Sequence, residues 1–127
     1  MIRLTLALSA ISSTPILAET SLSDEILSQV NLDEIIVARD VMPPVARFRF
    51  TAPGLQSGFD YAQLSDVMMT LCSTHALPKL GEIRAEMWQI IVSLSDRVVE
   101  FGASDANAVQ VFETFDVVDN QCTWGGI

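Results

Sequence analysis

Apolar and polar side chains alternate strictly along residues 45–52, which read VARFRFTA. The two arginines, Arg47 and Arg49, fall on one face of an extended chain, and the alanines and phenylalanines fall on the other. Because successive side chains of a strand point to opposite faces, this period of two predicts a β-strand with one buried face. Pro53 and Gly54 would end the strand. The face expected in the core carries Ala46, Phe48, Phe50 and Ala52.

A helix is expected after this strand. Asp60 can cap it, and Gln63 lies three residues on, as in a capping box. Apolar residues then recur at spacings of three and four, which predicts one apolar stripe on a helix that ends at Pro78. The stripe consists of Leu64, Val67, Met68, Leu71, Cys72 and His75.

Upstream of residue 45 the pattern is less regular. Ile35, Ile36 and Val37 favour a strand over residues 34–39, because β-branched side chains are enriched in strands. The following Pro43-Pro44 pair forces a turn. Residues 19–33 are acidic and polar, and either a short helix or a loosely held arm fits them.

Downstream, residues 88–101 predict a β-hairpin with a tight turn around Asp96. Ser104 or Asp105 can then cap a second, shorter helix. A final hairpin is expected from Phe115–Val118 and Gln121–Trp124, with its turn at Asp119-Asn120. The first hairpin would bury Trp88, Ile90, Val92, Leu94, Val99 and Phe101, and the second helix would bury Ala108, Val111, Phe112 and Phe115.

This order of elements predicts an α+β fold of the ferredoxin-like split βαβ type, with two helices on one face of an antiparallel sheet. An additional N-terminal strand and the C-terminal hairpin complete it. The sheet face without helices would carry Arg47, Arg49, Ile91, Ser93, Val98 and Glu100.

The first eighteen residues are typical of a secretory signal peptide. Arg3 precedes an apolar stretch from Leu4 to Leu17, and the small residue Ala18 is followed by Glu19. The stretch is too short and too rich in Ser and Thr for a membrane span. We therefore expect a signal peptide over 1–18, an N-terminal arm over 19–33 and a single domain over 34–127. The product would be periplasmic or secreted, with no membrane span after signal removal.

The charge balance bears on partners. The chain has 7 basic and 16 acidic residues and a formal net charge of −9. Nucleic acids and anionic lipids need Lys and Arg to neutralise phosphate, so this balance argues against both as partners. Solubility alone accounts for an acidic surface.

Two cysteines, Cys72 and Cys122, bear on stability. In an oxidising compartment a disulfide between them is expected, and the long loop it closes corresponds to about 4 kcal/mol in the chain-entropy model. Two separate buried thiols are the plain alternative. A sharper alternative is a soft-metal site for copper(I) or zinc, because thiolate, thioether and imidazole suit those ions. Its ligands would be Met68, Cys72, His75 and Cys122.

No motif predicts catalysis or a cofactor. His75 is the single histidine, and no nucleophile elbow, Gly-rich phosphate loop, haem-attachment motif or Cys-x-x-Cys pair is present. The adjacent carboxylates Asp24-Glu25 and Asp33-Glu34 are typical of solvated charge. We therefore expect no enzyme activity, no cofactor and no resident metal.

Three segments resemble a family of small exported bacterial proteins of unknown function. They are the RFRFxAP pattern at 47–53, the IVSLxDRxVEFG pattern at 91–102 and the DxxCxW pattern at 119–124. The family hairpin often has Pro where Val98 stands and Gly where Asn120 stands. The resemblance covers residues 45–124 and implies no activity.

We therefore expect an exported, disulfide-closed binding or structural envelope protein whose partner is a protein or a small molecule. Arg47 and Arg49 mark the expected interaction face, because arginine pairs carboxylates bidentately at interfaces. Cross-strand pairing of these arginines with Glu100 or another acid is the plain alternative. A periplasmic metal-binding protein and, by fold analogy alone, an ACT-like small-ligand regulatory module are the rival functions.

Overall fold

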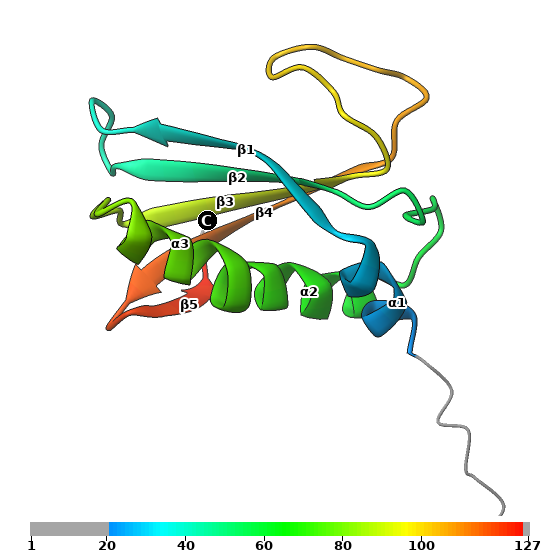
Figure 1. Ribbon diagram of the computed structural model, residues 1–127, viewed down its shortest axis with the longest axis horizontal. Coiled ribbons are helices and arrows are strands. Elements are labelled where there is room, and N and C mark those ends of the chain that lie inside the picture. Colours follow the sequence, from blue (N-terminus) through cyan, green and yellow to red (C-terminus); the bar gives the residue numbers. More distant parts are fainter. Residues whose placement is uncertain (1–20, 126–127) are drawn as a thin grey trace, which may run out of the picture.

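A computed structural model describes residues 21–125 of the chain, so the expected signal peptide over 1–18 lies outside the described residues. Five strands and one long bent helix make up most of the described chain, with a short helix before them (Figure 1). The helical elements are α1 (Leu22–Gln29), α2 (Tyr61–Thr70), the π-helical segment η1 (Leu71–Ala76) and α3 (Leu77–Glu82). The strands are β1 (Asn31–Ala38), β2 (Val45–Thr51), β3 (Gln89–Ser95), β4 (Gln110–Val118) and β5 (Gln121–Trp124).

The sheet is mixed, and its strands follow one another in chain order from β1 to β5. β2 and β3 are parallel, and the α2–η1–α3 helix crosses between them. The other neighbours are antiparallel. Figure 1 shows α1 and the long helix along one side of the sheet, with the 96–109 loop rising on the other. The α+β class is confirmed, with one covered sheet face and one face without helices.

The alternation of residues 45–52 is confirmed. Ala46, Phe48, Phe50 and Ala52 are all buried, and Arg47 and Arg49 lie on the opposite face. In the parallel register Phe48 pairs with Val92 and Phe50 with Leu94, so the two central strands contribute one continuous apolar layer. The fully buried side chains of this core include Phe48, Val67, Met68, Leu71, Ile90, Val92, Leu94 and Phe115.

The helix begins where it was expected. The Asp60 side chain accepts a hydrogen bond from Ala62 N at 3.1 Å. Pro78, however, does not end the helix, which continues to Glu82. In η1 the hydrogen-bond register widens, and Leu77 N donates to Cys72 O, five residues earlier. Pro78 then lies at the start of α3, directly after the widened register of η1.

The hairpin expected over 88–101 and the second helix expected from Ser104 or Asp105 are both wrong. β3 ends at Ser95 and pairs with β4, which occupies residues 110–118. Ala108, Val111, Phe112 and Phe115 have helical spacing, but the segment is rich in the β-branched and aromatic residues that favour a strand. Three residues expected in the core are exposed as a result: Trp88 (60% exposed), Phe101 (53% exposed) and Phe112 (58% exposed).

The ferredoxin-like split βαβ arrangement is therefore not confirmed. That arrangement needs a second helix crossing back over the sheet, and β4 occupies the segment from which it would come. The observed sheet instead contains one parallel βαβ unit, flanked by β1 on one side and by the β4–β5 hairpin on the other. That hairpin is confirmed, and Asp119 and Asn120 at its turn have positive φ values of 50° and 59°.

The N-terminal elements extend the fold by one helix and one edge strand. Of the two structures that fit residues 19–33, the short helix is observed over Leu22–Gln29, and Ser21 caps it by accepting a hydrogen bond from Asp24 N. Ile26 on this helix is buried in the core. The strand expected over 34–39 is confirmed as β1, which begins earlier, at Asn31.

Candidate functional site

A disulfide joins Cys72 in η1 to Cys122 in β5, so the predicted link is present. The two Cα atoms are 6.2 Å apart, and fifty positions separate the residues in the sequence. Cys72 is fully buried. The bond ties the helical layer to the last strand of the sheet, which is four residues long and pairs with β4 alone. The disulfide lies on the covered face of the sheet and has a structural role there.

The alternative metal site has no free thiolate to offer as a ligand. Both sulfur atoms of the cysteines are in the disulfide and are not available as thiolates. Met68 is fully buried, whereas His75 is exposed and its Nδ1 lies 2.8 Å from Thr74 Oγ1. Within residues 21–125 no group of three or more His, Cys, Asp or Glu side chains is placed to hold a metal ion.

The sheet face without helices carries the expected pair of arginines. Arg47 and Arg49 lie on β2, and their neighbours in the parallel register on β3 are Ile91 and Ser93. Phe112 on β4 pairs with Ser93 and continues this face. These five side chains form the floor of a groove.

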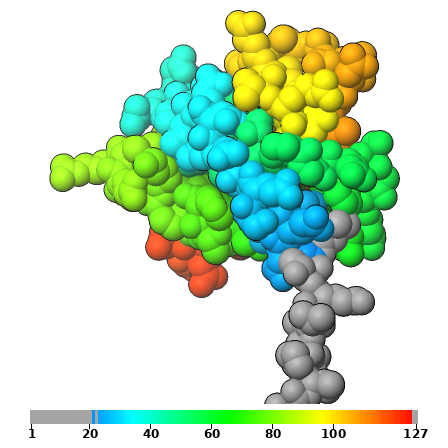
Figure 2. Space-filling model, turned by 45° about the vertical axis from the view of Figure 1, so that its right-hand side comes forward, coloured from blue at the N-terminus to red at the C-terminus, as the bar shows by residue number. Residues whose placement is uncertain are grey.

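The 96–109 loop forms the wall of this groove. In the space-filling view the loop, coloured yellow to orange, stands out from the body of the molecule (Figure 2). Its two ends are joined by a pair of contacts: Asp96 N donates to Val109 O at 3.0 Å, and Val109 N donates to Asp96 Oδ1 at 3.0 Å. The loop is thus closed at its base by one residue pair.

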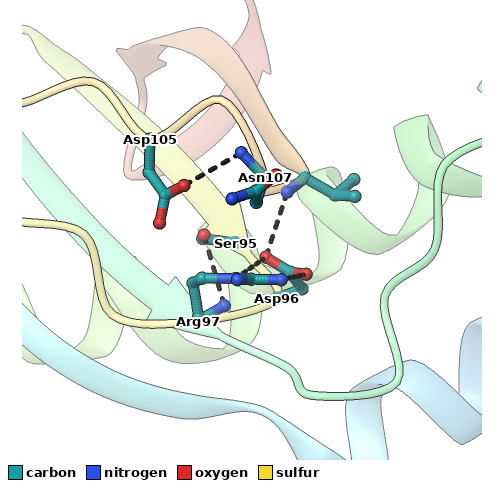
Figure 3. A network of polar contacts seen from close by, with 6 residues as sticks. Ser95, Asp96, Arg97, Asp105 and Asn107 are labelled. Atoms are coloured by element: carbon teal, nitrogen blue, oxygen red, sulfur yellow. Dashed lines mark hydrogen bonds and ion pairs between the residues drawn. The ribbon is translucent and has the colours of Figure 1, made fainter.

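Charge reinforces this closure (Figure 3). Arg97 donates from Nε to Asp96 Oδ1 at 3.2 Å and from Nη2 to Asp96 Oδ2 at 3.0 Å. The hydrogen bond from Arg97, together with the Val109 N–H, lowers the pKa of Asp96 below its ordinary value. Asp96 in turn raises the pKa of Arg97. The carboxylate is therefore held ionised at the point where the loop leaves the sheet.

A tight turn at residues 100–103 brings an aromatic ring against the two arginines. Ala103 N donates to Glu100 O at 2.9 Å, and Gly102 has a φ of 84°, which a side chain disfavours. Phe101 precedes this glycine. Its ring lies under both guanidinium groups, with the Cζ atoms of Arg47 and Arg49 at 5.4 and 5.5 Å from the ring centroid. Both distances fall in the range of a cation–π interaction.

The two arginines differ in their other partners. Arg49 donates to Glu34 Oε2 at 3.0 Å and to the backbone oxygen of Val99 at 2.7 Å, and its side chain is only 15% exposed. Cross-strand pairing with an acid therefore describes Arg49, although the acid is Glu34 on β1 and not Glu100. Among the described residues Arg47 has no carboxylate within ion-pair distance and no side-chain hydrogen bond, and it is partly buried.

The groove between loop and sheet encloses a cavity of about 260 Å³. Phe101 and Phe112 expose more than half of their surface there, at 53% and 58%. Ser93, Glu100 and Gln110 add polar groups. A second hollow of about 490 Å³ adjoins it toward β1 and shares Arg49, Ser93 and Phe101 with it. The site combines Arg47, which has no carboxylate partner among the described residues, with an acid and an apolar wall, and this set suits binding.

Sequence patterns identified part of this site. Arg47, Arg49, Ile91 and Ser93 lie on the expected face, but Val98 and Glu100 lie in the loop and not on a strand. Phe101 and Phe112 were expected in the core and are instead at the groove. The sequence signal that could have placed Phe101 in a turn is the glycine directly after it, since the positive φ that Gly102 adopts is typical of tight turns.

None of the helices in the described part of the chain is both long and apolar enough to span a bilayer. No significant match was found among curated proteins or among solved structures. A family model of a family of unknown function, DUF6497, matches residues 18–127. The match includes the groove, both cysteines and the three sequence segments at 47–53, 91–102 and 119–124. The chain therefore belongs to the DUF6497 family, whose function is unknown.

Proposed function

We propose that this protein is an exported binding protein and that the groove between the 96–109 loop and the open sheet face is its binding site. The observation that carries the proposal is the state of Arg47. A guanidinium group that is partly withdrawn from water usually has a carboxylate partner, and Arg47 has an aromatic ring but no such partner among residues 21–125. Its N–H donors are thus left for a bound molecule.

The surroundings of Arg47 also support binding. Small-molecule sites are concave and mostly apolar, with a few polar groups that fix orientation. The groove has this composition, with Phe101, Phe112 and Ile91 as the apolar part and Arg47, Ser93 and Gln110 as the polar part. The scaffold beneath it is the centre of the sheet, where β2 and β3 are flanked on both sides. A rigid floor under a shaped loop suits a binding site.

Export is the second part of the proposal, and the disulfide supports it. Disulfides persist in secreted and periplasmic proteins and are rare in the reducing cytosol. The buried Cys72 is bonded to Cys122. Mass spectrometry of the protein from its source cells should find an N-terminus at Glu19 and two cysteines that resist alkylation. Recovery of the full-length chain with two free thiols would contradict this part of the proposal. The alkylation experiment also distinguishes a disulfide from a metal-thiolate site, because thiolates freed from a metal react and disulfide sulfurs do not.

The binding site is tested by chemical-shift mapping on the purified, oxidised protein. ¹⁵N-labelled protein is titrated with a panel of small carboxylic acids, amino acids, phosphates, sugars and short peptides. We expect at least one class to shift the amide signals of residues 91–93 and 100–112, and we expect the Arg47→Gln variant to lose that response. Arg84→Gln is the matched control, because Arg84 is an exposed arginine outside this groove. A panel that shifts no groove amide, or a response that persists in Arg47→Gln, would overturn the proposal.

A further inference from the structure

We infer that the ligand of this groove is a free α-amino acid with an apolar side chain, bound as the zwitterion. This inference rests on the proposed function and adds the chemical class of the molecule. It follows from three features of the groove: the positions of its unlike charges, its apolar wall and its size.

The charges favour a zwitterion over a simple anion. Arg47 can receive a carboxylate, but Glu100 lines the same cavity and would repel one. The chain also carries a formal net charge of −9, so its overall field opposes an anionic ligand. No ion pair joins Arg47 to Glu100 among the described side chains. A molecule with one negative and one positive group satisfies both residues and has no net charge to oppose the field.

The two arginines have separate tasks in this arrangement. Arg49 is held by Glu34 and by Val99 O, so its position is fixed by contacts within the protein. It fixes the loop to the sheet on one side of the cavity. Arg47 lies over the Phe101 ring on the same side of the sheet, with its donors unused by described residues. A planar guanidinium group can pair with both oxygens of one carboxylate, which sets the orientation of the ligand.

The apolar wall and the size of the cavity limit the rest of the ligand. Phe101, Phe112 and Ile91 offer apolar surface, and the exposed halves of the two phenylalanine rings would be covered by a bound side chain. The cavity of about 260 Å³ lies near the lower end of small-molecule sites, which run from about 300 to 1,000 Å³. That volume suits a single amino acid and excludes an oligopeptide lying wholly within it.

Three related compounds test the inference: L-phenylalanine, N-acetyl-L-phenylalanine, which lacks the amino charge, and L-phenylalaninamide, which lacks the carboxylate. Isothermal titration calorimetry measures each Kd, and amide shifts locate the site. We expect each derivative to bind about ten- to a hundredfold more weakly than the free amino acid, which is the usual loss when one charge-assisted pair is removed. L-leucine should bind in the same groove.

Two variants assign each charge to its residue. In Glu100→Gln the free amino acid should lose its advantage over the acetylated compound, and in Arg47→Gln it should lose its advantage over the amide, while Arg84→Gln keeps the wild-type preferences. Glu100 is exposed on the loop, so its variant keeps the test valid even if Arg47→Gln folds poorly. Equal binding of the acetylated compound by the wild type would overturn the inference, yet its shifts in the groove would still support the proposed site. If neither free amino acid shifts the amide signals of the groove, the inference is also overturned. The panel of other small molecules named above then tests the proposed binding function separately.

Discussion

Removing the disulfide by the double substitution Cys72→Ala and Cys122→Ala should destabilise the protein by about 4 kcal/mol. The value follows from the fifty-position separation of the two cysteines, because a cross-link that closes a loop of this length restricts the unfolded chain strongly in the chain-entropy model. Alanine is chosen because Cys72 is fully buried among apolar side chains, where a hydroxyl would add a second penalty.

The structure indicates that the native state would lose little else. Cys122 lies in β5, which keeps its antiparallel pairing with β4 from Phe115 to Val118. Trp124 also retains its contact with Phe115, at 4.9 Å between ring centroids. For a domain of this size about 4 kcal/mol corresponds to a fall in Tm of roughly 15–20 °C. Total stabilities run from about 5 to 15 kcal/mol, so the variant should still fold at room temperature.

Urea unfolding followed by circular dichroism measures the effect. The free energy of unfolding should fall by about 4 kcal/mol, and the m-value should rise, because an unfolded chain without the cross-link exposes more surface. Wild-type protein kept in a reducing agent is the matched control and should behave like the variant. A loss below about 1 kcal/mol with an unchanged m-value would refute the reasoning, since it would mean that the bond does not restrict the unfolded chain.

Three further changes test the loop and the last hairpin. Asp96→Ala should remove the hydrogen bond from Val109 N to the carboxylate and flatten the acid-unfolding profile. The lowered folded-state pKa of Asp96 contributes stability above about pH 4, and that contribution is lost as the pH falls through the folded-state pKa. Asp96→Asn keeps an acceptor for Val109 N, and equal acid profiles for wild type and Asp96→Ala would contradict the reasoning. Gly102→Ala should lower Tm, because the φ of 84° at this position is strained for a residue with a side chain. The NMR signals of Phe101, which report its contact with the arginines, should shift as well. An unchanged Tm would count against the turn. Asn120→Gly should raise the free energy of unfolding, measured by urea unfolding, because glycine adopts the positive φ of 59° at this hairpin turn without steric cost; a decrease would contradict the turn geometry.

Local sequence patterns predicted correctly those segments in which a single pattern, such as strand alternation or a helix cap, was present without a competing one. The 45–52 strand has a period of two and pairs on both sides, so its buried face followed directly from the sequence. The Asp60 cap and the stripe after it gave the start of the long helix. Its end was missed because a π-helical turn shifts the hydrogen-bond register before Pro78, and no side-chain periodicity reveals such a shift.

Competition between segments decided the parts that were missed. Residues 97–101 and 110–118 both have the composition of a strand, and only one of them can pair with the free edge of β3. The longer segment forms nine residues of β4 and supplies Phe115 to the core, whereas the shorter one lies in a loop whose base Asp96 closes. Short-range spacing cannot weigh these alternatives, because the difference lies in contacts with residues far away in the chain.

The same competition produced the groove. Phe112 breaks the alternation of β4 because it is apolar on the open face, and this break made the segment resemble a helix. Phe101 breaks the rule that aromatic rings lie in the core, because the turn at Gly102 places it over Arg47 and Arg49. Local rules are most often violated where a surface has a task beyond folding. Both phenylalanines line one cavity beside Arg47, which has no carboxylate partner within residues 21–125. The residues that misled the fold prediction are therefore the ones that support a binding site.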